Sequence, residues 1–217
     1  MYFRMLHDEF SGELTYLLAD VHAKEAVLID PHSRDLDVLS ALLAEHDLQL
    51  KWVLRTHHHD HLHSEEFQNL AQLGAPLIQG DEQLRAYRPD DGASLAFGNE
   101  ALGVWSTPGH TATCLSFAWR DRLFCGGLLN TMECPDQPFA AAPAQLWESI
   151  TQRLFKFPNE TLLFSGHAQH LRTVSTIMDQ RRWNPSFTGC SRDEFLASMR
   201  SLPDKPLWNA HNKNTQR

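Results

Sequence analysis

The sequence has no long hydrophobic run, no basic run and no cysteine pattern of a disulfide scaffold. No stretch of the 217 residues approaches the 18 or more consecutive apolar residues of a membrane-spanning helix, and Asp8 and Glu9 interrupt the start of the chain. We therefore expect a cytoplasmic protein without a signal peptide or membrane contact. The formal net charge of −8 disfavours a nucleic acid partner, because a duplex would be repelled.

The four cysteines lack CxxC spacing and are expected to stay reduced. No glycine-rich loop follows the first strand-like run, which counts against a doubly wound nucleotide-binding fold. No Gly/Ser linker divides the chain, and its length suits one domain. We expect that domain to span residues 1–207, followed by a flexible polar tail over residues 208–217.

Short strand-like runs cluster with hairpin turns in each half of the chain, and amphipathic segments separate them. The pattern predicts strands at 14–18, 26–29, 52–54, 101–105, 115–119, 123–125 and 161–164. It predicts helices at 35–46, 65–73, 144–155 and 191–200, the last opened by a capping box of Ser191 and Glu194. This arrangement favours two mixed sheets that face each other with helices outside.

Histidine is the unusual residue, with 13 copies. Five fall within seven residues, directly after a predicted strand: His57, His58, His59, His61 and His63. His110 and His167 follow two other strands. Neutral imidazole is the commonest metal ligand, so strand-end histidines from distant segments predict a metal site, although a solvated histidine run can also bind metal adventitiously.

Asp60 lies inside this cluster and has two interpretations. Beside metal-bound histidines, a carboxylate can orient an imidazole or accept a proton from bound water, so Asp60 is the candidate catalytic residue. It can also cap the following helix, and the two roles are compatible.

Three motifs carry a family resemblance: 56–61 (Thr-His-His-His-Asp-His), 108–111 (Pro-Gly-His-Thr) and 166–167 (Gly-His). With them the chain resembles the metallo-β-lactamase superfamily, and residues 173–177, 182–185 and 193–195 make it most similar to the persulfide dioxygenases, iron-dependent relatives of glyoxalase II. The resemblance implies a four-layer αββα sandwich with a metal at one edge between the sheets. It also implies Fe(2+) held by two histidines and an aspartate, of which the histidines are His57 and His110.

The chain departs from that family at the third ligand. Gly127 stands where the resemblance implies the aspartate, and the histidine loop is one residue short. We predict that His59 completes a three-histidine site with His57 and His110, and that the position at Gly127 leaves room for an exogenous anion. Further ligands or outer partners of the metal are expected among His61, His167 and His58. One ion is expected rather than two, because the bridging carboxylate is missing.

Three functions follow as alternatives. The first is an oxidoreductase that oxidises a low-molecular-weight thiol or persulfide with dioxygen at one iron ion. The second is a Zn(2+)-dependent hydrolase of a thioester, as in glyoxalase II, and the third is an inactive binding or regulatory relative. Cys125 or Cys134 is either a redox thiol near the metal or a buried structural residue. The resemblance leaves a homodimer open.

Overall fold

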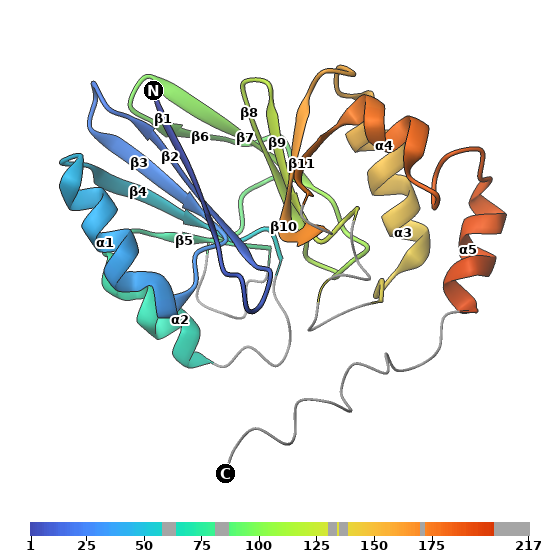
Figure 1. Ribbon diagram of the computed structural model, residues 1–217, viewed down its shortest axis with the longest axis horizontal. Coiled ribbons are helices and arrows are strands. Elements are labelled where there is room, and N and C mark those ends of the chain that lie inside the picture. Colours follow the sequence, from blue (N-terminus) through green and yellow to red (C-terminus); the bar gives the residue numbers. More distant parts are fainter. Residues whose placement is uncertain (58–63, 81–86, 130–133, 135–138, 170–171, 202–217) are drawn as a thin grey trace, which may run out of the picture.

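The computed structural model describes residues 1–57, 64–80, 87–129, 134, 139–169 and 172–201. Two β-sheets face each other, with helices on the outer face of each (Figure 1). The predicted αββα sandwich is thereby confirmed. The proposed domain end at residue 207 and the tail over 208–217 lie outside the described residues.

The first sheet has the order β1-β2-β3-β4-β5. Its strands are β1 (Tyr2–His7), β2 (Leu14–Asp20), β3 (Glu25–Ile29), β4 (Gln49–Leu54) and β5 (Leu77–Ile78). On its outer side lie α1 (Leu36–Glu45) and α2 (Ser64–Leu70), as Figure 1 shows. The parallel pairs β3–β4 and β4–β5 bring the carboxyl ends of these strands to one edge.

The second sheet has the order β11-β10-β9-β8-β7-β6. Its strands are β6 (Ser94–Phe97), β7 (Glu100–Ser106), β8 (Leu115–Trp119), β9 (Arg122–Gly126), β10 (Leu162–Gln169) and β11 (Arg172–Thr176). Its outer face carries α3 (Pro143–Glu148), α4 (Ile177–Trp183) and α5 (Arg192–Arg200) (Figure 1). Strands β9 and β10 run parallel, and Gly126, the last residue of β9, pairs with Ser165 in the middle of β10.

Strand β2 shows how alternation builds the layers, because both of its faces are buried. Leu14, Tyr16 and Leu18 point into the cluster between the two sheets, whereas Leu17 and Ala19 point into the cluster beneath α1. A third cluster packs the second sheet against its helices. Each fully buried Leu or Phe contributes about 1.5–3 kcal/mol to folding.

The predicted helix at 144–155 is not one regular helix. After α3 the chain forms a π-helical turn at Ser149–Arg153 and a 3-10 turn at Leu154–Lys156. Two hydroxyls accompany the irregularity: Ser149 Oγ donates to the carbonyl of Pro108 at 2.7 Å, and Thr151 Oγ1 donates to that of Trp147 at 2.8 Å. Side chains that bond to backbone carbonyls compete with the regular helical pattern.

Two contacts hold the sheets together beside the histidine of β10. Tyr16 Oη donates to the carbonyl oxygen of Ser165 at 2.5 Å, and the Ala168 amide donates to the Gly12 carbonyl at 2.7 Å. An isolated antiparallel bridge also joins Glu13 to His167. The loop between β1 and β2 therefore fixes the end of β10.

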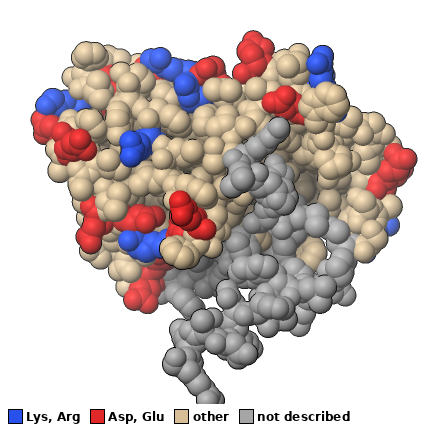
Figure 2. Space-filling view, in the orientation of Figure 1, with Lys and Arg blue, Asp and Glu red and all other residues tan. Residues whose placement is uncertain are grey.

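On the face shown in Figure 2, acidic and basic side chains are interspersed over the described surface. Within the described ranges, the structure contains no helix with the length and apolar character needed to cross a membrane.

Candidate metal site

His57 follows β4, and its neighbour Thr56 ties it to a buried carboxylate. The Thr56 amide and the Thr56 hydroxyl both donate to Asp30, each at 2.7 Å, and Thr56 Oγ1 lies 2.8 Å from His57 Nδ1. Asp30 and Thr56 are buried, whereas His57 is half-buried. These hydrogen bonds thus connect the buried Asp30 carboxylate to the His57 ring at the edge of the sheet.

This geometry assigns the tautomer of His57. A threonine hydroxyl has one proton, and with Asp30 ionised that proton is donated to the carboxylate. The Thr56 oxygen then accepts the Nδ1–H of His57, so Nε2 keeps the lone pair. A carboxylate acting through a hydroxyl therefore prepares Nε2 as a metal ligand, in the manner of outer-shell partners in metal sites.

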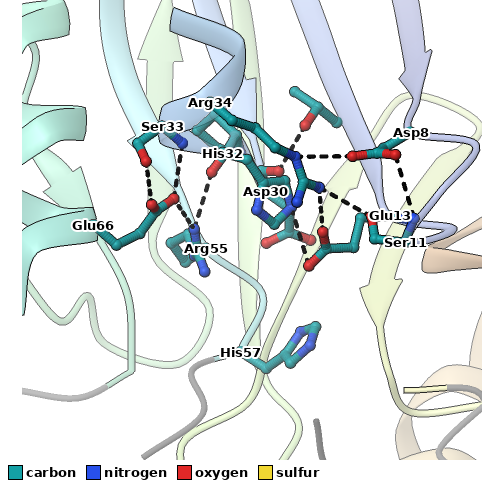
Figure 3. Close-up of polar contacts among 12 residues, drawn as sticks. Asp8, Ser11, Glu13, Asp30, His32, Ser33, Arg34, Arg55, His57 and Glu66 are labelled. Carbon is teal, nitrogen blue, oxygen red and sulfur yellow. Dashed lines mark hydrogen bonds and ion pairs between the residues drawn. The ribbon is translucent and has the colours of Figure 1, made fainter. Parts of the chain in front are cut away.

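Asp30 lies in a polar network that extends over the end of the first sheet (Figure 3). Burial raises the pKa of Asp30, while the nearby Arg55 guanidinium and the hydrogen bonds from Thr56 oppose that rise. Arg55 Nη1 donates to the Pro31 carbonyl at 2.9 Å and lies 3.8 Å from Glu66 Oε1. Burial is the larger effect, so the pKa of Asp30 lies above its ordinary value, and the Nδ1–H tautomer of His57 belongs to the ionised form of Asp30.

Two glycines press against the Thr56–His57 pair. A Cβ built on Gly126 would lie 2.3 Å from Thr56 Oγ1 and 2.9 Å from His57 Nδ1, and one on Gly166 would lie 3.2 Å from His57 Cε1. Gly126 also has a φ of +55°, in the left-handed region. The backbones of β9 and β10 therefore pack directly onto the side of the His57 ring.

His110 lies in the turn between β7 and β8, as predicted, and is fully buried. Its ring centroid is 5.0 Å from that of His57, with the planes at 65°. The turn is fixed by backbone bonds, including Leu115 N to Thr56 O at 2.7 Å and Ala141 N to His110 O at 3.0 Å. His57 and His110, distant in sequence, are thus neighbours.

The space above Gly127 is filled by His110. A Cβ on Gly127 would lie 2.5 Å from both Nδ1 and Cε1 of the His110 ring. The prediction that this position leaves room for an exogenous anion is therefore wrong. The missing side chain has been replaced by a neighbouring imidazole, because interiors close over spaces of that size.

His167 and Cys134 complete the described part of the site. His167 lies within β10, is buried, and has its ring centroid 6.0 Å from that of His57. One ligand atom each of His57, Cys134 and His167 lies within 4.8 Å of the other two. The sequence left Cys134 open between a redox and a structural role, because its spacing gives no metal-site signature.

The remaining candidates lie outside the described residues. These are His58, His59, Asp60 and His61, so the predicted set of His57, His59 and His110 stays a prediction. All four cysteines are described, and none forms a disulfide. Burial raises the pKa of Cys114 to about 11 and that of Cys125 to about 12, so both are protonated thiols at neutral pH.

Two facing sheets with histidines gathered at one edge define a metallo-β-lactamase fold. No family model matches the chain. It is 31% identical over 210 residues to persulfide dioxygenase ETHE1, mitochondrial, of Homo sapiens, covering 92% of this chain and 80% of that protein. The crystal structure of ETHE1 from Myxococcus xanthus superposes with a TM-score of 0.82 at 34% identity, covering 97% and 96% of the two chains.

A hydrolase is also similar to this chain. The hydroxyacylglutathione hydrolase of Bartonella henselae is 27% identical over 213 residues, covering 94% of this chain and 77% of that protein. The chain belongs to the metallo-β-lactamase superfamily and, within it, to the persulfide dioxygenase family.

Proposed function

We propose that this protein is a metal-dependent oxidoreductase that uses dioxygen to oxidise a low-molecular-weight thiol or persulfide. The observation that carries the proposal is the convergence of His57 and His110 from separate loops, in a chain that belongs to the persulfide dioxygenase family. The His57 tautomer set by Thr56 and Asp30 supports a ligand role, since it places the ring's lone pair on Nε2.

The proposed ligands of one Fe(2+) ion are His57, His59 and His110, with His61, His167 and His58 as further ligands or outer partners. Bound iron would bring an anionic sulfur and dioxygen together on one centre. Three neutral imidazoles carry no charge, so this site would be one unit more positive than a site with a carboxylate. That difference favours an anionic thiolate or persulfide. Asp60 is the proposed acceptor for a proton at this centre.

The second candidate is a zinc-dependent hydrolase of a thioester. The thiol of Cys134 beside His57 and His167 favours it, because thiolates select zinc over iron among common resident metals. The similarity to hydroxyacylglutathione hydrolase gives it further support. Here a bound zinc ion would activate water for attack on the thioester.

Oxygen uptake separates these candidates. Protein loaded anaerobically with iron should consume one dioxygen per persulfide, since a dioxygenase places both oxygen atoms in its substrate. The zinc form should leave dioxygen untouched. Turnover of a thioester by the zinc form, without oxygen uptake by the iron form, would overturn the first candidate. Inactivity of both forms would overturn both and leave a binding or regulatory relative.

The proposed substrates are small molecules, and a homodimer stays open. Cytoplasmic location stays a prediction from the sequence. The human relative is named as a mitochondrial protein, so fractionation of cells that express this chain is the relevant measurement.

A further inference from the structure

The connection between β9 and α3 brings a sulfur atom to the site where Gly127 brings no ligand. Cys134 is fully buried, and its Sγ belongs to the group whose ligand atoms lie within 4.8 Å of one another. The other two members, His57 and His167, come from the end of β4 and from β10. Three donors that converge from separate segments are the arrangement that a metal ion requires.

The spacing is close to that of a metal complex. Bonds of about 2.0–2.3 Å to a tetrahedral ion place the ligand atoms roughly 3.5 Å apart. A contraction of about 1 Å would therefore close the group around an ion. The backbones of Gly126 and Gly166 confine the His57 ring, and the bridge to Glu13 holds the backbone of His167, so the adjustment falls mainly on Cys134.

The charge of this donor set compensates for the missing aspartate. Two neutral imidazoles and a thiolate carry one negative charge, as do two imidazoles and a carboxylate. Sulfur is a softer donor than oxygen, so the exchange shifts metal preference from iron(II) towards zinc or copper(I). The crowding of Gly127 by His110 gives the physical reason why a carboxylate at that turn is excluded.

We infer that Cys134 Sγ is a metal ligand, together with the ring nitrogens of His57 and His167. The resident cation is then held by two nitrogens and one sulfur. This donor set is an alternative to the three-histidine set proposed above, with which it shares only His57. The inference rests on the metal dependence of the proposed function, but not on its reaction with dioxygen.

The other cysteines provide the contrast. Cys125 Sγ donates to the Phe164 carbonyl at 3.5 Å, and Cys114 Sγ accepts from the Thr111 amide at 3.2 Å. Cys190 contacts the carbonyl of its neighbour Ser191, just before α5. It is the least buried of the four, so Cys190→Ser is the matched control for loss of a thiol.

The first test needs no variant. X-ray absorption at the zinc edge of the wild-type full chain, loaded with one equivalent of zinc, should show one sulfur at about 2.3 Å and nitrogen or oxygen at about 2.0–2.1 Å. A first shell of nitrogen and oxygen alone would overturn the inference, whatever the activity of the protein.

The second test assigns the sulfur. Cobalt(II) added to wild-type protein and to Cys190→Ser should give a sulfur-to-metal charge-transfer band in the near ultraviolet. Cys134→Ser should lose the band and bind zinc more than about 100-fold more weakly, beyond the loss expected for an outer partner. A band that persists in Cys134→Ser would refute the assignment.

Circular dichroism would show whether Cys134→Ser misfolds. A third variant, Cys134→Asp, keeps the inference testable in that case. Cys134→Asp should lose the sulfur signal, keep a bound ion and gain affinity for iron(II) relative to zinc, because oxygen replaces sulfur. An unchanged sulfur signal would again overturn the inference. Oxygen uptake, measured separately, decides the proposed function: a sulfur ligand without uptake leaves the inference standing, and uptake without a sulfur ligand leaves the function standing.

Discussion

Replacing Thr56 by valine removes the hydroxyl that joins Asp30 to His57. Two contacts to that oxygen disappear, at 2.7 Å to Asp30 and 2.8 Å to His57 Nδ1, while the amide of residue 56 still reaches Asp30. Thr56 is 1% exposed, so water cannot replace the lost hydroxyl. A buried acceptor left with fewer donors costs about 1–3 kcal/mol. We expect that decrease in the free energy of unfolding.

Metal affinity should fall as well, because His57 loses the partner that fixes its tautomer. Outer-shell losses of this kind weaken binding about 10–100-fold, which is about 1.4–2.7 kcal/mol. Urea denaturation of the apoprotein measures stability, and zinc titration against a chelating dye measures affinity. Thr56→Ser keeps the hydroxyl and is the control. Metal affinity equal to wild type in folded Thr56→Val would refute the role assigned to this hydroxyl.

Further predictions concern pH and packing. Burial lowers the pKa of His32 to about 4, so below pH ~6.5 the unfolded chain binds more protons than the folded one. The free energy of unfolding therefore falls towards pH 4, and His32→Gln should remove up to about 3 kcal/mol of that fall. A plot of unfolding free energy against pH that runs parallel to that of the wild type would contradict this. Backbone donation from Asn99 lowers the pKa of Asp20 to about 2, so its contribution exists above pH ~4 and disappears towards pH 2; Asp20→Asn should flatten that acid limb in thermal melts. Gly127→Ala should displace the His110 ring, lowering the melting temperature and metal affinity, and no change in either would show that the turn adapts.

Part of the fold could be predicted, because strands such as β2 and β3 are buried on both faces. Strand β2 and strand β3 stand out as apolar runs, and the capping box of Ser191 and Glu194 does open α5. Strand β1 was missed, since none of its residues is fully buried and it carries the exposed Arg4 at the sheet edge. Edge strands need fewer apolar residues, so local sequence predicts them poorly.

The site could be predicted only in part. Strand-end position and residue type predicted His57 and His110 as candidates, and the structure brings their rings near each other. His167 was predicted to follow a strand, but it lies within β10, with its ring near that of His57. The filling of the space at Gly127 could not be foreseen, because it depends on how the turn at residue 110 packs in three dimensions. The position of Cys134 in the site could not be foreseen either, because its separation along the chain from His57 and His167 matches no metal-ligand motif.

The contact of Gly126 and Gly166 with His57 has an entropic consequence. An imidazole that rotates freely loses torsional freedom when it coordinates an ion, which opposes binding by about 1 kcal/mol. Here that freedom is already lost when the strands pair, so coordination starts from an immobilised ring. Two residues without side chains thereby strengthen ion capture although neither touches the ion.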